Sequence, residues 1–329
     1  MGLTGIDIGT NRLVSASLDK NGDTIFKTER DAFYRISPNG NINRKAIKMS
    51  LDKTNSSYLV DNGDFIVVGE AAIYAALDRN DKTRRPMVSG IISPKDKNNL
   101  PILKLLIKNI VGEGNGEKLC YSVPAKPMDG DFDIDYHKNI LEMYFTELGY
   151  KPEAINEAFA VGLSELLDDG LTGLNISMGA GLANVCMLSK GQNMLNFSTT
   201  KSGDYIDTSV AYALDMSKSL VQVEKECGID LLAPKNTFEE AVVVYTKVVI
   251  KYLVENMNYE FIKNKSKLPI FREPLNIVVS GGLANMINFN KVVAEEVSRV
   301  GMPFDIKAVK RAQHPDNCVA SGALLAARL

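Results

Sequence analysis

The chain has 329 residues, with 38 basic and 40 acidic side chains and a formal net charge of -2. A hydrophobic fraction of 45% and a charged fraction of 24% are ordinary for a globular protein, and they exclude a disordered or fibrous chain. The balanced charge gives no electrostatic reason to expect nucleic acid or an anionic membrane as a partner, and the length suits about two domains.

The first thirty residues predict a meander of three strands. Apolar residues alternate or cluster over 3–9, 13–19 and 24–30, and Asn21-Gly22 supplies a tight turn before the third strand. A small β-rich subdomain is expected next, over about residues 31–78.

Within this subdomain, the dipeptides Asn39-Gly40 and Asn62-Gly63 predict turns. Residues 65–70 predict a strand and residues 71–77 a helix. Helices with apolar residues on one face follow, together with one short buried strand. The expected helices are 100–111, 137–149 and 155–167, and the expected strand is 118–125.

The second half of the chain repeats this plan. Residues 173–200 predict another meander, whose glycine turn at Gly179 lies 170 positions after Gly9. A long helical region is expected over about 207–265, a buried strand over 276–282 and a C-terminal helix over 315–329. The repetition indicates a duplicated α/β fold, because a period this long is not that of a solenoid.

Residues 170–189 carry no charge, but four glycines and several polar side chains predict a buried strand pair rather than a transmembrane helix. The four cysteines lie far apart and only two histidines exist, so neither a zinc site nor a disulfide framework is expected. Sparse thiols suit a reducing compartment, and the N-terminus lacks the features of a signal peptide. We therefore expect a cytoplasmic protein.

The segment from Gly5 to Asn11 places a carboxylate at the end of a buried strand, directly before a glycine turn. Backbone N–H groups in such a turn can hold phosphate oxygens, and Gly9 lets the backbone approach a ligand closely. Asp7 stands where a carboxylate could hold the water shell of Mg²⁺. Taken alone, an ordinary hairpin explains these residues equally well.

Two further glycine segments strengthen the phosphate interpretation. Gly179-Ala180-Gly181 occupies the matching place in the second half, and two facing hairpins would hold a polyphosphate between two domains, where ligand sites often lie. Ser280 to Ala284 is a buried strand that leads into Gly281 and Gly282, which leave room for a flat base or a ribose. A simple strand-to-helix turn is the alternative explanation of this last segment.

In this order the segments resemble the motifs of the superfamily that contains actin, sugar kinases and the seventy-kilodalton heat-shock chaperones. Residues 5–11 and 177–184 resemble its two phosphate motifs, and residues 280–284 its adenosine motif. Residues 156–160 and 315–326 resemble its two connecting helices.

Among the members of this superfamily, the bacterial actin-like filament proteins of the MreB and MamK group are the most similar, on the strings at 68–71 and 122–125. The resemblance implies a duplicated actin-like (ribonuclease H-like) α/β fold with two domains around a nucleotide cleft. Domain I would comprise residues 1–160 and 316–329, and domain II residues 161–315 with a helical subdomain at about 210–270.

The resemblance also implies roles for single residues. Asp7 would position Mg²⁺ through water, and Glu157 would orient the attacking water. The residues implied to bind the nucleotide are Gly9, Thr10, Asn11, Gly179, Ala180, Gly181, Gly203, Asp204, Lys225, Glu226, Gly281, Gly282 and Leu283. A solvated helix face explains Lys225 and Glu226 as well as a ribose contact does.

Two positions depart from the family pattern at the second phosphate motif. Ser177 stands in place of an Asp that has a catalytic role, and Leu182 stands in place of a Thr. A hydroxyl cannot replace the charge of a carboxylate, so hydrolysis is expected to be slow. Nucleotide binding need not weaken equally, because backbone N–H groups make most of the phosphate contacts.

The function expected from this resemblance is that of an actin-like cytoskeletal protein that binds ATP and Mg²⁺, assembles into filaments of itself and hydrolyses ATP slowly. The alternative is a superfamily ATPase that forms no filaments, either a small-molecule kinase or a chaperone-like regulator. A kinase needs a base for its acceptor, which Ser177 removes, and a chaperone needs chain beyond the ATPase core. Adaptor proteins are further candidate partners, and no direct contact with nucleic acid or membrane is expected.

Overall fold

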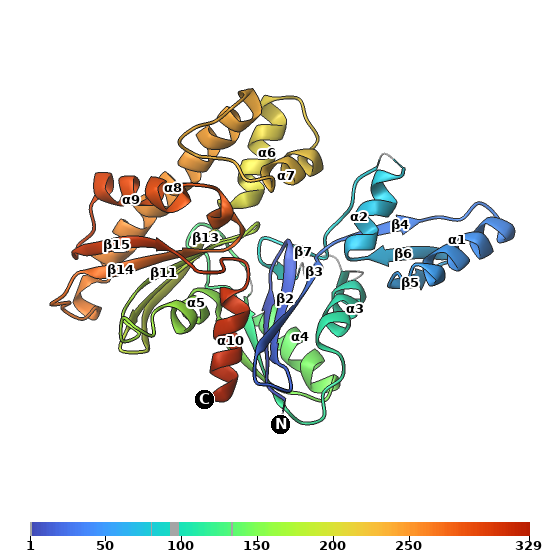
Figure 1. Cartoon of the computed structure of the whole chain (residues 1–329), viewed down its shortest axis with the longest axis horizontal. Helices are drawn as coiled ribbons and strands as arrows, with labels where there is room; N and C mark the ends of the chain where they lie inside the picture. Colours follow the sequence, from blue (N-terminus) through green and yellow to red (C-terminus); the bar gives the residue numbers. More distant parts are fainter. Residues whose placement is uncertain (1, 80, 93–98, 133) are drawn as a thin grey trace.

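The computed structural model describes residues 2–79, 81–92, 99–132 and 134–329. Within these residues, two α/β domains each centre on a five-stranded sheet (Figure 1). The first sheet has the strand order β10-β9-β1-β2-β3. Its strands are β1 (Thr4–Ile8), β2 (Arg12–Leu18), β3 (Thr24–Arg30), β9 (Lys118–Val123) and β10 (Lys151–Asn156).

The second sheet repeats this arrangement with the order β13-β12-β11-β14-β15. In both sheets the first strand pairs antiparallel with the second and parallel with a later one. The duplicated actin-like α/β fold expected from the sequence is therefore confirmed, whereas the exact domain limits stay a prediction. The strands are β11 (Gly173–Met178), β12 (Ala183–Ser189), β13 (Gln192–Thr199), β14 (Leu275–Ser280) and β15 (Ile306–Arg311).

The uncharged stretch at 170–189 forms β11 and β12, as predicted, and nearly every residue of the two strands is buried. Among the described residues, no helix has both the length and the apolar character needed to cross a bilayer. The second sheet packs its apolar face against α8 (Thr237–Lys263), where Ile176, Val279 and Ile250 belong to one core cluster.

Two helices lie between the sheets, α5 (Glu157–Glu165) and α10 (Cys318–Arg328) (Figure 1). Their backbones touch, since a Cβ on Gly322 would overlap the carbonyl group of Ala160. Helix α10 also covers β1 closely enough that a Cβ on Gly5 would overlap its backbone. The C-terminal helix thus packs on the first strand of the chain.

The small subdomain contains the predicted strand and helix as β6 (Asp64–Val68) and α2 (Glu70–Leu77). The Asn62-Gly63 turn joins β5 (Tyr58–Asp61) to β6, also as predicted. One prediction was incomplete, because the subdomain carries a 13-residue helix, α1 (Asn41–Lys53), beside β4 (Phe33–Ile36). That helix is largely polar and exposed, and it buries only Leu51.

The other predicted helices are present with small shifts of their ends. The helix expected at 155–167 begins at Glu157, because the two preceding residues pair with β9 as part of β10. Strands β10 and β15 were not predicted. The remaining helices are α3 (Asn99–Val111), α4 (Ile134–Glu147), α6 (Gly203–Ala213), α7 (Lys218–Lys225) and α9 (Phe289–Val300).

Candidate functional site

A cleft of about 670 Å³ lies between the two domains. It brings together nearly all the residues to which the family resemblance gave a role. Those that line it are Asp7, Gly9, Thr10, Asn11, Glu157, Ser177, Gly179, Ala180, Gly181, Gly203, Lys225, Glu226, Gly281, Gly282 and Leu283. Asp204 does not line the cleft and instead pairs with Arg85. The role of each residue stays a prediction.

The two glycine turns have the same hydrogen-bonding pattern. Gly9 N donates to Arg12 O at 3.1 Å in the first turn, and Gly179 N donates to Leu182 O at 3.1 Å in the second. The backbone N–H groups inside the turns have no acceptor in the described part of the chain, which leaves them available for phosphate oxygens. They belong to Thr10, Asn11, Ala180 and Gly181.

A third turn, which the sequence analysis missed, lies against both glycine turns. Ser89 and Gly90 connect β7 (Met87–Val88) to β8 (Ile91–Ile92), and both have positive φ, 52° and 77°. Gly90 N donates to the hydroxyl of Thr10 at 2.9 Å, and a Cβ on Gly181 would lie 2.6 Å from Gly90 N. This close packing leaves room only for glycine at position 181.

Asp7 and Glu157 present carboxylates to the cleft from the first domain. Asp7 accepts a hydrogen bond from Ser122 Oγ at 2.8 Å, and Glu157 accepts one from Asn184 Nδ2 at 2.7 Å. Burial raises the pKa of Asp7 to about 6 against the lowering effect of Ser122, and the charge of Asp316 raises it further. Burial and the charge of Asp7 also raise the pKa of Glu157.

These raised pKa values fit a site that holds a cation, because a positive charge between the carboxylates would remove their mutual repulsion. The described residues contain no cluster of three or more His, Cys, Asp or Glu side chains that could hold a metal by themselves. Mg²⁺ usually keeps several waters and takes only one or two carboxylates together with substrate phosphates. The donor set therefore fits a magnesium ion that arrives with a nucleotide.

The two residues that depart from the family pattern both lie at the second glycine turn. Ser177 is buried at the edge of the cleft with 4% of its surface exposed, so it presents a neutral hydroxyl there. Leu182 directs its side chain onto the third turn, where a Cβ on Gly90 would lie 2.6 Å from Leu182 Cδ1. Its apolar side chain therefore has a packing partner.

The opposite end of the cleft carries the predicted adenosine segment. Gly281 has φ 81° and donates its N–H to Pro315 O at 3.0 Å, while a Cβ there would lie 2.5 Å from Met178 O. A Cβ on Gly282 would meet nothing within 4 Å, so this glycine faces open space where a flat base could lie. Among the side chains that line the cleft here, the sequence analysis missed Asn285, Arg311 and Asp316.

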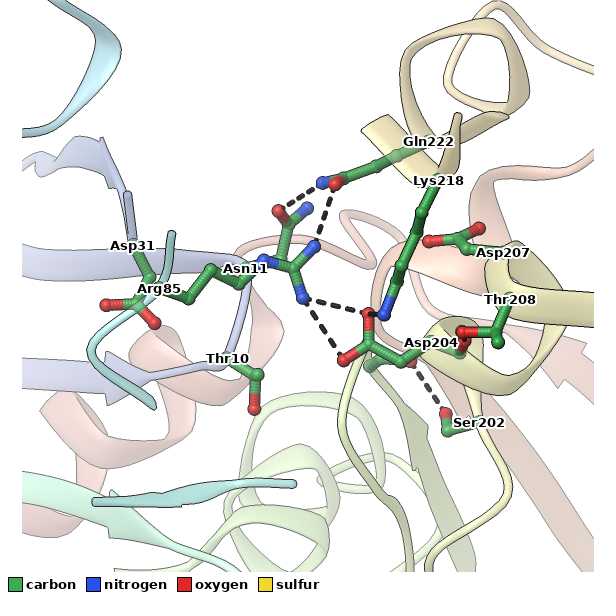
Figure 2. A network of polar contacts seen from close by, with 12 residues as sticks. Thr10, Asn11, Asp31, Arg85, Ser202, Asp204, Asp207, Thr208, Lys218 and Gln222 are labelled. Atoms are coloured by element: carbon green, nitrogen blue, oxygen red, sulfur yellow. Dashed lines mark hydrogen bonds and ion pairs between the residues drawn. The ribbon is translucent and has the colours of Figure 1, made fainter. Parts of the chain in front are cut away.

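Polar side chains join the two domains across the mouth of the cleft, and we call them the interdomain network. Arg85 donates to Asp204 at 2.9 Å and to Gln222 at 2.8 Å, and Gln222 donates to Asn11 at 2.6 Å (Figure 2). The members are Asn11, Arg12, Arg30 and Arg85 of the first domain with Asp204, Gln222 and Glu226 of the second.

Within this network, Glu226 accepts hydrogen bonds from Arg12 at 2.9 Å and from Arg30 at 2.6 Å. Burial would raise the pKa of Glu226, but Arg30 and Arg12 lower it from 4.5 to about 2. Lys225 is engaged as well, in a mostly buried ion pair with Asp207. Both side chains thus have protein partners, and a contact with ribose or base would need them to exchange these partners.

We expect Glu226→Ala to lower the free energy of unfolding by about 2 kcal/mol, because it leaves the partly buried Arg12 without its anion and leaves Arg30 only its longer ion pair with Glu70 at 3.4 Å. Urea unfolding at neutral pH measures this. The control is Glu255→Ala on α8, whose exposed ion pairs with Lys251 and Arg299 are worth less than about 1 kcal/mol. If the two variants lost the same free energy of unfolding, the interdomain network would contribute no more to stability than exposed ion pairs do.

The lowered pKa of Glu226 also predicts how the contribution of this residue to the free energy of unfolding varies with pH. A carboxyl whose pKa is lowered on folding stabilises the folded state fully above its unfolded pKa, here 4.5. That contribution is lost only as the pH falls towards about 2. Between pH 7 and pH 5 the difference in stability between native protein and Glu226→Ala should therefore stay constant.

Duplicated domains around a glycine-lined cleft define the actin-like superfamily of folds, as the sequence resemblance implied. The chain belongs to the volactin family, whose sequence model matches residues 2–327. No curated protein sequence matches the chain significantly.

Solved structures with the same fold include members of the MreB and MamK group and an ethanolamine utilization protein. A MamK double helical filament is 17% identical with a TM-score of 0.72, and it covers 100% of this chain and 99% of its own. MreB5 of Spiroplasma citri bound to AMPPNP is 16% identical with a TM-score of 0.65, over 98% and 95% of the two chains. EutJ, an ethanolamine utilization protein from Carboxydothermus hydrogenoformans, is 14% identical with a TM-score of 0.56, over 99% and 90%. These similarities confirm the predicted fold.

Proposed function

We propose that this chain is an actin-like cytoskeletal ATPase of the prokaryotic type, which binds ATP with Mg²⁺ between its domains and assembles into filaments. The observation that carries the proposal is the meeting of two glycine turns and the adenosine segment in one cleft, beside Asp7 and Glu157. MamK and MreB5 structures of this fold are described with AMPPNP bound, which supports an adenine nucleotide as the ligand.

The residues of the cleft divide the work between binding and hydrolysis. The free N–H groups of the two glycine turns would hold phosphate oxygens, and Asp7 would accept hydrogen bonds from the water shell of Mg²⁺. A bound magnesium ion would supply positive charge against the phosphates and the two carboxylates. Asn184 fixes the Glu157 carboxylate, since it donates to that group and accepts from Ala125 N at 2.8 Å. Glu157 would then orient and deprotonate the attacking water.

Ser177 gives the proposed enzyme a slow rate. A neutral hydroxyl at this place cannot accept a proton from water as a carboxylate can, and the described carboxylate of Asp207 is paired with Lys225, so we assign the role of base to Glu157. Filament assembly would depend on nucleotide binding through the closure of the two domains. A ligand that binds the closed state better than the open state shifts the equilibrium towards the closed state. The proposed location is the cytoplasm, and the proposed partner is the chain itself, with adaptor proteins as further candidates.

Two measurements test this function. We expect calorimetry to detect binding of ATP and ADP in the presence of Mg²⁺, and pelleting with electron microscopy to detect filaments when ATP is present. No nucleotide binding at millimolar concentration would overturn the proposal. A protein that stays monomeric with ATP and phosphorylates a small-molecule acceptor would instead favour the kinase alternative.

A further inference from the structure

We propose that Asp316 is a second metal-facing carboxylate of the cleft, which accepts a hydrogen bond from a water of the nucleotide-bound Mg²⁺ and so replaces the charge that is missing at Ser177. This inference rests on the proposed nucleotide-binding function. It assigns a positioning role to a residue outside the two phosphate motifs.

The packing of α10 brings Asp316 to the end of β1. The two elements touch at Gly5, because a Cβ there would overlap backbone atoms of Ala320 and Leu324. The two chain termini lie near each other in Figure 1, so α10 runs back along β1. The start of α10 lies at the cleft, because Asn317 and Val319 line it. Two strand residues from Gly5 to Asp7 span about 6.6 Å, and four residues from Ala320 back to Asp316 span about 6 Å or more. Both carboxylates therefore lie at the end of these two elements that faces the cleft, and both line it.

Side chains on the adenosine side hold Asp316 in place. Asn285 Nδ2 donates to Asp316 Oδ2 at 2.8 Å, and Arg311 donates to Asn285 Oδ1 at 2.8 Å. Arg311 is itself fixed, since its Nε donates to Ala284 O at 2.7 Å. The second oxygen of Asp316, Oδ1, has no donor among the described residues, and Asp316 as a whole is exposed and lines the cleft. One oxygen is thus anchored, and the other is available to water.

The charges around Asp316 favour a cation. Among the described residues, neither Asp7 nor Asp316 has a Lys, Arg or His nitrogen within 4.0 Å of its carboxylate. The charge of Asp316 adds to burial in raising the pKa of Asp7, so the two groups repel each other across the cleft. A divalent cation between them would turn this repulsion into attraction. Mg²⁺ usually keeps several of its waters, so Asp7 and Asp316 would bind those waters and not the metal itself.

The test is Asp316→Asn, which keeps an oxygen that can accept from Asn285 and removes the charge. We expect the increase in ATP affinity caused by Mg²⁺, measured by calorimetry with and without EDTA, to fall about tenfold, as for other residues that orient metal-bound groups. Affinity for ATP in EDTA should stay the same or rise slightly, because a negative charge near the phosphates is removed. The readout is binding and does not depend on turnover.

A matched control uses a second Asp–Asn pair, which lies in the second domain. Asp230 accepts from Asn288 Nδ2 at 2.7 Å and does not line the cleft. Asp230→Asn should leave the effect of Mg²⁺ on ATP affinity unchanged. Adding Ser177→Asp to the Asp316→Asn variant should restore most of the lost effect, if one carboxylate can take the place of the other.

The outcomes separate this inference from the proposed function. If the native protein binds no ATP, both are overturned. If the native protein shows an effect of Mg²⁺ and a folded Asp316→Asn variant shows the same effect, only the role of Asp316 is overturned. Equal weakening with Mg²⁺ and with EDTA would make Asp316 a nucleotide contact and would also overturn its role. Should Asp316→Asn fail to fold, Asn285→Ala frees the carboxylate from its anchor and should reduce the Mg²⁺ effect about threefold; no reduction would count against the proposal.

Discussion

Replacing Glu157 by Gln is expected to slow ATP hydrolysis about a hundredfold, while ATP affinity changes less than about threefold. Gln keeps an oxygen that can accept from Asn184, so the side chain should hold its position and lose only its capacity to take a proton. Phosphate release at saturating ATP gives the rate, and calorimetry gives the affinity. The large effect follows from Ser177, which leaves Glu157 without a second base at the second glycine turn.

Glu147→Gln on α4 is the control for this experiment, because Glu147 lies outside the cleft in a surface ion pair with Lys104. It should hydrolyse ATP at the native rate. If Glu157→Gln also retained the native rate, another group would have to activate the water, and the hydrolytic role given to Glu157 would be wrong. Loss of binding together with loss of hydrolysis would point to a change in the shape of the cleft.

The second large effect is expected at the crossing of α5 and α10. Gly322→Ala should lower the free energy of unfolding by about 3 kcal/mol or more, because its methyl group would occupy the place of the Ala160 carbonyl and would push the helices apart. In an exposed helix interior the same change stabilises by about 1 kcal/mol, so the packing reverses the usual sign. Urea or thermal unfolding measures the difference.

Ser321→Ala, one residue away on the half-buried face of α10, provides the comparison. It should change the free energy of unfolding by less than about 0.5 kcal/mol. A stability of Gly322→Ala equal to that of the native protein would mean that the two helices can separate without cost. The close contact between their backbones would then not contribute to the stability of the domain pair.

Strong local patterns made most of the fold predictable. Alternating or continuous apolar runs, bounded by turns such as Asn21-Gly22, predicted the strands of both meanders. The elements that were missed have weak local signals. Helix α1 buries only Leu51, and β10 and β15 are edge strands rich in Lys and other polar residues. Such segments become strands because a neighbouring strand is present, which a local reading of the sequence does not reveal.

The candidate site was predictable where its residues stand in short motifs. The glycine turns, Asp7 and Glu157 belong to such motifs and meet in the cleft. Asn184 carried a usable signal, since it is a polar residue in the otherwise apolar strand β12. Arg85 carried no such signal, because its partner Asp204 is more than a hundred positions away in the sequence. Asp316 carried none either, because the packing of α10 on β1 brings it to the cleft.

The packing of α10 on β1 also determines when the first domain can be completed during synthesis. Residues near the start of the chain, such as Gly5 and Val14, share a core with Ala320 and Leu324. At about 5–20 residues per second, a ribosome needs roughly 15–65 s to reach that helix. During this interval the apolar surface that α10 will cover is exposed on the nascent chain. The first domain is therefore finished only after the second domain has been synthesised, and chaperones that bind apolar surface have access to its first strands throughout that interval.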